Sequence, residues 1–294
     1  MRVFIALLCL LLLFPAAGMA EEAFGLTLDL SAEVLDFDAA GVNVTDADAL
    51  EELIQKMPNL REVRMFDSRM KREGMEKLFD SHPDIFFGFT IRFDIHTVRT
   101  DDTAFSTLHR SQITDKRDDY HTTKELSVLR MCTRLKALDL GHNKLTDLSF
   151  LEGLTDLRVL IISPNYGLTD LSPLAHLTEL EYLEVFSTNT TDVSPLSGLT
   201  KLRDLNLSCS DQLRDISPLY DLPALERFWC GRGKVPQEQL EIMAQKHPDC
   251  HCDFESLPTR GGWREHPHYD VLFQMFKGKD YLPFEDSFTD GEML

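Results

Sequence analysis

Residues 135–156 read LKALDLGHNKLTDLSFLEGLTD, and the chain then repeats this pattern three more times. The copies are LRVLIISPNYGLTDLSPLAHLTE from residue 157, LEYLEVFSTNTTDVSPLSGLTK from 180 and LRDLNLSCSDQLRDISPLYDLPA from 202, followed by LERFWC from 225. Their leading leucines lie 22 or 23 residues apart. A fixed period of this length predicts a stack of similar coils, because one coil alone has too little apolar surface to form a core.

Each repeat combines a strand with a turn-forming stretch. Leu138 and Leu140 lie two positions apart, which places both on one face of a strand, and the later repeats keep this spacing. A second apolar set follows each strand. Three repeats carry a proline there, and its fixed φ and missing N–H disfavour a regular helix. These prolines are Pro173, Pro195 and Pro218.

Polar residues recur at the same period. Asn143 and Asn165 follow two of the strands, where we expect them to bond loop backbone groups of neighbouring coils. Thr188 and Ser210 take that position in later repeats, so the ladder should be weaker there. One aspartate per repeat is expected to accept backbone N–H bonds in a turn. These aspartates are Asp147, Asp170, Asp192 and Asp215.

The L-x-x-L-x-L strands, the two asparagines and the T-D-[LV]-S-P-L block resemble the short, internalin-like leucine-rich repeats of bacterial proteins over residues 126–230. The resemblance implies an α/β solenoid, a leucine-rich-repeat superhelix. It would have a concave parallel β-sheet and short turns or 3₁₀ segments on the outside of its central coils.

Longer coils flank the regular ones. The stretches at 50–60, 75–85 and 240–250 align without gaps, and each reads as an amphipathic helix that ends at a proline. We therefore expect helices on the convex side of the terminal coils. Together these coils predict one continuous solenoid of about ten coils. Its flanking strands are expected near 35–37, 63–65, 87–93, 112–114 and 250–254.

The pattern divides the chain into four parts. Residues 1–20 are expected to be a signal peptide, 21–125 irregular or longer leucine-rich coils, 126–256 regular repeats with a terminal coil, and 257–294 a tail that caps the last coil. Residues 94–125 are charged and lack clean repeats. For them we favour an irregular coil over a protruding loop, because long loops without structure are uncommon in compact domains.

The start of the chain predicts export. Arg2 precedes an apolar run that ends at Pro15, and Gly18 and Ala20 stand at the −3 and −1 positions of a cleavage site. The run is too short to span a bilayer. We expect a secreted protein cleaved after Ala20, without membrane insertion. The net charge of −19 disfavours nucleic acid and anionic membrane surfaces as partners.

The residues between the strand leucines are expected to face the concave side. This face, opposite the leucine core, should present an exposed apolar and aromatic patch with a charged rim, and such patches mark binding sites. The alternative is that the C-terminal tail covers it. The candidate binding residues are Val159, Ile161, Tyr182, Glu184, Phe186, Asp204, Asn206, Arg227 and Trp229.

These features predict a non-enzymatic, monomeric protein that binds a macromolecular partner, a protein in the first instance, through the concave face. One alternative is a glycan-binding module that uses Trp229, Tyr182 and Phe186. A second is an enzyme or metal-dependent activity in the tail. No catalytic motif with its expected local context occurs, so we assign no catalytic residue and no cofactor.

The tail contains His266 and His268 beside Glu265 and Asp270. These could ligate a metal, but they lack the i, i+4 pairing of helical zinc sites. We favour a short helix opened by Pro267 that packs on the end of the solenoid.

Cysteines are few for a secreted protein. Five remain after the signal peptide, an odd number that leaves at least one unpaired within the chain. The stretch HPDCHCDF at 247–254 aligns with HPDIFFGF at 82–89, so Cys250 and Cys252 take positions of core apolar residues. A disulfide from Cys230 to Cys252, or to Cys250, is the remaining possibility in an oxidising compartment.

Overall fold

The computed structural model describes residues 20–108 and 120–284, and every structural statement below concerns these. The expected signal peptide and the expected strand at 112–114 lie outside them, apart from Ala20. The chain divides into two compact units, Met1–Thr90 and Ile91–Leu294, and each is described by itself.

The first unit contains a small parallel sheet. Strands β1 (Ala20–Ala23) and β2 (Leu26–Asp29) form an antiparallel pair. Strands β3 (Val34–Asp36), β4 (Glu62–Arg64) and β5 (Phe86–Gly88) then form a three-stranded parallel sheet. The register aligns Leu35 with Val63 and Val63 with Phe87, and all three are buried.

Two helices connect these strands, as the repeat pattern predicts. Helix α1 (Ala47–Ile54) begins after Asp46, whose carboxylate accepts bonds from two backbone N–H groups of the first turn. Helix α2 (Arg72–Ser81) follows β4. Each helix ends before its proline, Pro58 or Pro83.

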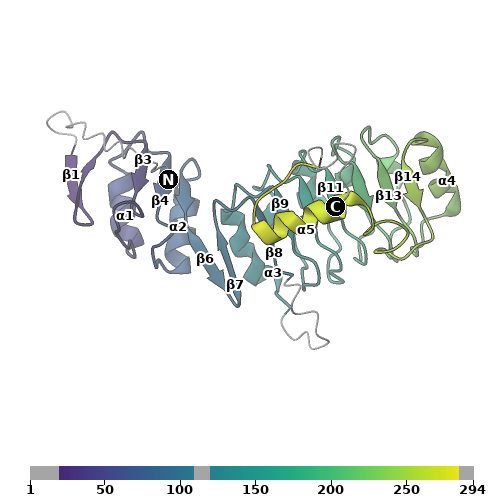
Figure 1. Cartoon of the computed structure of the whole chain (residues 1–294), viewed down its shortest axis with the longest axis horizontal. Helices are drawn as coiled ribbons and strands as arrows, with labels where there is room; N and C mark the ends of the chain where they lie inside the picture. Colours follow the sequence, from purple (N-terminus) through teal and green to yellow (C-terminus); the bar gives the residue numbers. More distant parts are fainter. Residues whose placement is uncertain (1–19, 109–119, 285–294) are drawn as a thin grey trace, which may run out of the picture. The chain divides into compact units, whose positions relative to one another are not determined.

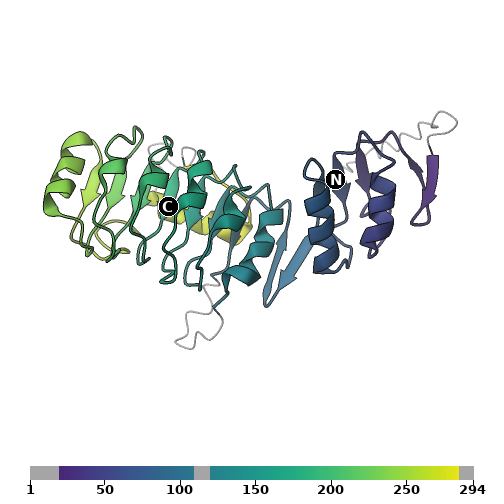
Figure 2. The same ribbon diagram turned by 180° about the vertical axis from the view of Figure 1, so that it is seen from behind.

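The second unit contains the regular coils (Figures 1 and 2). It starts with a two-stranded sheet of β6 (Thr90–Phe93) and β7 (His96–Arg99). A seven-stranded parallel sheet follows, in sequence order. Its strands are β8 (Ala104–Ser106), β9 (Ala137–Asp139), β10 (Val159–Ile161), β11 (Tyr182–Glu184), β12 (Asp204–Asn206), β13 (Arg227–Trp229) and β14 (His251–Asp253).

The connections in this unit are mostly short helices. Helix α3 (Thr123–Leu126) and the 3₁₀ segment η2 (Ser127–Met131) precede β9. The predicted 3₁₀ turns are confirmed as η3 (Ser149–Leu151), η4 (Ser172–His176), η5 (Ser194–Leu196) and η6 (Ser217–Leu219), the last three with proline in their first turn. The predicted terminal helix is α4 (Gln237–Lys246), and α5 (Pro267–Gly278) is the last helix of the described residues.

The solenoid class is confirmed, but two details differ from the prediction. The parallel strands lie in two sheets of three and seven strands, not in one continuous sheet. In addition, β8 lies within the segment that lacks clean repeats. Sequence reasoning missed it because Ala104 and Ser106 flank a single large apolar residue, Phe105, which aligns with Leu138 of β9.

Candidate functional site: the concave face and its strap

The parallel register arranges the concave residues in two columns across the seven-stranded sheet. The first column contains Ala104, Ala137, Val159, Tyr182, Asp204, Arg227 and His251. The second contains Ser106, Asp139, Ile161, Glu184, Asn206, Trp229 and Asp253. Eight of the nine predicted binding residues therefore lie side by side on β10–β13, and Phe186 lies two residues beyond the end of β11.

The expected exposure of this face is wrong. All nine predicted binding residues are buried, with exposed fractions between 0 and 6%. The reason is that residues 257–284, called the strap below, fold back over the sheet. Figure 1 shows α5 of the strap in front of the strands, and in Figure 2, seen from behind, it lies behind them.

The strap does not pack as predicted. Helix α5 begins at Pro267 as expected, but it contacts β8 and β9 rather than the last coil. After α5, Lys279 adopts a left-handed conformation with φ of 62°. The chain then returns across the sheet, so that the Phe284 ring lies 5.9 Å from the Tyr182 ring, measured between ring centroids. The tail thus covers the concave face instead of the end of the stack.

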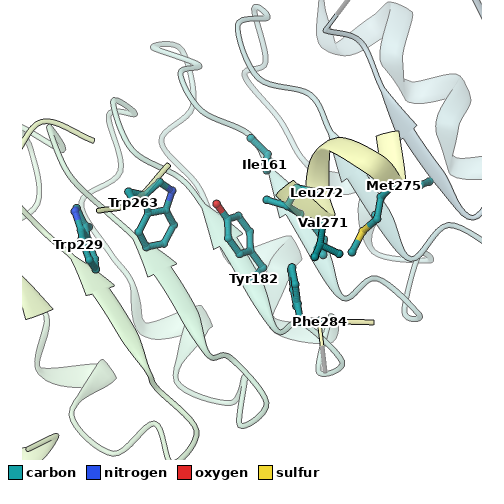
Figure 3. Packing of buried hydrophobic residues seen from close by; sticks show 11 residues of the cluster. Ile161, Tyr182, Trp229, Trp263, Val271, Leu272, Met275 and Phe284 are labelled. Carbon is teal, nitrogen blue, oxygen red and sulfur yellow. The ribbon is translucent and has the colours of Figure 1, made fainter. Parts of the chain in front are cut away.

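An apolar cluster joins the strap to the sheet (Figure 3). Trp263 lies between Trp229 and Tyr182, at ring-centroid distances of 5.1 and 5.5 Å. The small residues Ala104 and Ala137 occupy the positions beneath α5. The cluster also contains Val159, Ile161, Val271, Leu272, Met275 and Phe284.

Glu184 is a fully buried carboxylate at the centre of the face. It accepts hydrogen bonds from Trp263 Nε1 at 2.9 Å, from Arg264 Nη2 at 2.8 Å and from the Tyr182 hydroxyl. Burial acts to lower the pKa of Arg264, but the charge of Glu184 and the other acidic groups nearby together raise that pKa. Burial, with the Glu184 charge, raises the pKa of Tyr182 well above its ordinary value. Two strap residues therefore satisfy one buried charge on the sheet.

Asp204 is the second buried carboxylate. His268 Nδ1 lies 2.6 Å from one of its oxygens, and Arg227 Nη1 lies 3.5 Å from the other. Arg227 also donates to the Trp263 carbonyl at 3.0 Å, and its guanidinium lies 4.4 Å from the Trp263 ring centroid. Burial, followed by the Arg227 charge, lowers the pKa of the neighbouring His266 to about 4.

Backbone groups fix the strap at both ends. Near its start, Asn206 Nδ2 donates to the Pro258 carbonyl at 2.8 Å, and Trp229 Nε1 donates to the Arg260 carbonyl at 3.1 Å. Near its end, the Ala104 N–H donates to the Lys279 carbonyl at 3.1 Å. Polar groups of the concave face are thus bonded to a polypeptide segment.

Sequence reasoning missed the strap residues Trp263, Arg264 and His268 as members of this site. A signal was present, because Glu184 and Asp204 each align with an apolar or aromatic residue of the preceding coil, Ile161 and Tyr182. A carboxylate on a surface with aromatic neighbours needs a cation when it is covered.

Asp139 is a further buried carboxyl group, in the second column on β9. It accepts from the Gly141 N–H at 2.9 Å and from Ser106 Oγ at 3.1 Å. Burial raises its pKa to about 6, because these hydrogen bonds offset only part of the lost hydration.

The cysteine bridge considered above is not formed. All five described cysteines are free, and the register aligns Cys252 with Phe228, whereas Cys230 lies just beyond the end of β13. Burial raises the pKa of Cys230 to about 12. Cys132 is fully buried, as expected for a residue that replaces a core leucine.

The two tail histidines bond to groups of the strap and of the sheet. His266 Nδ1 accepts from the His268 N–H at 3.2 Å, while His268 binds Asp204. Within residues 20–108 and 120–284, no group of three or more His, Cys, Asp and Glu side chains is arranged to hold a metal ion. In the same ranges, no helix has both the length and the apolar character needed to cross a membrane.

Comparison with known families supports the repeat assignment. Residues 133–176 match the family model of leucine-rich repeats, described as two copies. With the observed strands and 3₁₀ turns, this match confirms the prediction of leucine-rich repeats and of a leucine-rich-repeat superhelix. Such solenoids serve as protein-interaction modules that offer an extended surface.

Several solved structures are similar to the chain. An internalin C2 from Listeria monocytogenes is 23% identical, with a TM-score of 0.42, over 79% of this chain and 84% of that one. An internalin, InlF, from the same species is 18% identical, with a TM-score of 0.37, over 73% and 65%. A leucine-rich-repeat protein from Leptospira interrogans is 16% identical, with a TM-score of 0.36, over 69% and 51%. The sequence matches none of the curated proteins compared with it.

Proposed function

We propose that this chain is a secreted, non-enzymatic, monomeric protein that binds another protein through the concave face of β8–β14. One observation carries the proposal: this face holds a polypeptide, the strap, by a buried tryptophan, paired carboxylates and backbone carbonyl bonds. Aromatic residues and arginine are the groups that dominate protein interfaces. The proposed binding residues are Val159, Ile161, Tyr182, Glu184, Phe186, Asp204, Asn206, Arg227 and Trp229.

The arrangement of charges favours recognition over catalysis. Glu184 has Arg264 and Asp204 has His268 within hydrogen-bond distance, and both carboxylates are fully buried. A general acid or base must instead reach the proton that it transfers in a bound substrate. Secretion rests on the pattern of residues 1–20, and N-terminal sequencing of protein recovered from the medium should give Glu21 as the first residue.

Affinity capture with matched variants tests the binding surface. The immobilised full chain is incubated with cell-surface extracts, and captured proteins are identified by mass spectrometry. Removing a central aromatic anchor typically weakens binding by about 2 kcal/mol or more, so Trp229→Ala should reduce capture at least about tenfold. Tyr166→Ala is the control, because Tyr166 is 70% exposed and lies outside the concave columns.

Two results would remove the concave face as the site. One is undiminished capture by a folded Trp229→Ala variant, with folding verified by circular dichroism. The other is loss of capture in Tyr166→Ala alone, which would place the binding surface at that exposed tyrosine. A glycan array with strong, selective signals would favour a carbohydrate ligand.

A further inference from the structure

The seven-stranded sheet has an apolar layer on each side. On the inner side, Leu138, Leu160 and Leu183 align in register and are fully buried in the core of the coils. On the concave side, a separate cluster forms between the sheet and the strap. Because successive side chains of a strand point to opposite faces, release of the strap would uncover only the second layer. The stack of coils keeps its own core.

The bonds that hold the strap are of a reversible kind. Arg264 and His268 pair with carboxylates of the sheet, and Arg227 donates to strap carbonyls. Buried ion pairs at an interface roughly balance the hydration that the charges lose, so they select which segment binds more than they add affinity. When the strap is released, both carboxylates regain water. The main stabilising contribution that is then lost is the burial of the apolar cluster.

The face is shaped for one kind of segment. Its aromatic end, with Trp229 and Tyr182, holds the indole of Trp263. Its other end has alanine at the first-column positions of β8 and β9, which leaves room for the apolar side of α5. Glu184 on β11 and Asp204 on β12 lie within the aromatic part and bind Arg264 and His268 of the strap.

We propose that the strap is an intramolecular competitor, and that a partner segment of the same chemistry takes its place on the concave face. That segment has an aromatic residue followed by an arginine, and an amphipathic helix whose first turn carries a histidine four residues after the arginine. The inference rests on the proposed function of the concave face. A tethered segment acts at an effective concentration in the millimolar range, so a free segment of equal affinity is excluded until the strap is loosened.

The chain contains its own reporter for strap release. It has two tryptophans, and both lie in the strap interface, Trp229 on the sheet and Trp263 on the strap. Both are fully buried, so acrylamide quenching of intrinsic fluorescence measures whether the strap is docked. The probe for competition is a labelled synthetic peptide of residues 257–284, which carries the required chemistry.

Full-length variants test the competition. The double variant Arg264→Ala/His268→Ala removes both strap partners of the buried carboxylates and leaves the residues of the concave face unchanged. Loss of these two partners should raise the affinity for the wild-type peptide at least about tenfold and should increase the quenching of tryptophan fluorescence. The control is Gln274→Ala, at an exposed position of α5. Its peptide affinity and tryptophan quenching should match those of the wild type. A peptide carrying Trp263→Ala should bind at least about tenfold more weakly.

Other outcomes would overturn the inference. Unchanged quenching and peptide affinity in the folded double variant would make the strap a permanent part of the fold. If that variant does not fold, Arg264→Gln takes its place with the same expectations. In a further outcome, the peptide affinity of the variant rises only under conditions in which light scattering shows dimers. That result would identify a second copy of the chain, not a separate partner, as the occupant of the concave face.

The inference and the proposed function fail in different ways. If a protein is captured in a Trp229-dependent way but the peptide does not exchange with the strap, the strap is not a competitor. The proposed binding function of the concave face would still stand. Peptide exchange without Trp229-dependent capture would support the competitor and contradict the binding function.

Discussion

Asn165 joins three loop backbone groups in the middle of the stack. Its Oδ1 accepts from the Leu145 N–H at 2.9 Å, and its Nδ2 donates to the carbonyls of Leu140 at 3.0 Å and Ile162 at 2.7 Å. The predicted bonding of Asn143 and Asn165 to neighbouring coils is thus confirmed. The hydroxyl of Thr188, in the same position of the next repeat, donates within its own coil to the Val185 carbonyl at 3.0 Å.

Asn165→Ala should destabilise the second unit by about 2 to 4 kcal/mol, because it leaves buried backbone groups without partners. Urea unfolding followed by circular dichroism measures the change. Asn189→Ala is the control: its amide donates to a single carbonyl at the surface, so we expect a change below about 0.5 kcal/mol. Equal effects of the two substitutions would contradict the role of Asn165.

Asp139 should make stability depend on pH. Its pKa is about 6 in the folded chain and near the ordinary value of 3.8 when unfolded, so the folded state binds the proton more tightly. Its contribution to stability therefore falls as pH rises from about 4 to 6, by about 3 kcal/mol in total. Asp139→Asn removes this dependence.

The measurement compares unfolding free energies of wild type and Asp139→Asn from pH 4 to pH 7. The variant should gain about 3 kcal/mol relative to wild type over that range, whatever the offset at pH 4. A constant difference would show that Asp139 titrates normally. Asp147→Asn, at an exposed turn carboxylate, should show no such gain over wild type in the same range.

At the scale of elements, local hydrogen bonds and turns were predictable from the sequence, whereas a strand that depends on tertiary pairing was not. Each recurring aspartate accepts a bond from the serine N–H two residues later, as predicted, at distances between 2.5 and 2.8 Å. The 3₁₀ turns follow from proline and these bonds. Strand β8 could not be read from the pattern, because its pairing with β9 is decided by neighbours distant in sequence.

Helix α5 should dock through one side. Met275 is fully buried in the cluster, whereas the adjacent Gln274 is exposed. Met275→Ala should weaken strap docking by about 2 kcal/mol or more, because buried methionine to alanine changes leave a cavity. Hydrogen exchange of the α5 amides measures this, and Gln274→Ala should leave exchange unchanged. A similar effect of both would contradict the assigned packing.

For the molecule as a whole, the repeats predicted the stack of coils but not the segment that covers its concave face. The two columns of the concave face follow from strand periodicity and were predicted correctly. Their burial depends on a tail that returns to strands more than one hundred residues earlier in sequence, such as β8. The tail has no repeat that would indicate this path, and its apolar helix positions fit an end cap equally well.

Coils at the two edges of the seven-stranded sheet should differ in local stability. Both β8 and β14 have one strand neighbour in this sheet, but β8 lies beneath α5 and is mostly buried, whereas β14 is half-buried. Amides of β14 should therefore exchange at least about tenfold faster than those of β8, corresponding to about 1.4 kcal/mol. Strand β11, which has two neighbours, is the protected reference. Equal rates at both edges would contradict protection by the strap.

The uneven columns of the concave face also give it a direction. Trp263 lies over the later strands and α5 over β8 and β9, so this part of the strap runs against the order of the coils. Alanines on β8 and β9 accept a helix, whereas the Trp263 indole lies over β11 to β13, beside Glu184 and Asp204. A segment with the same residues in reverse order would place its helix on Trp229 and its indole on the alanines. The surface therefore distinguishes N-to-C polarity, and a bound protein would be held in a single orientation.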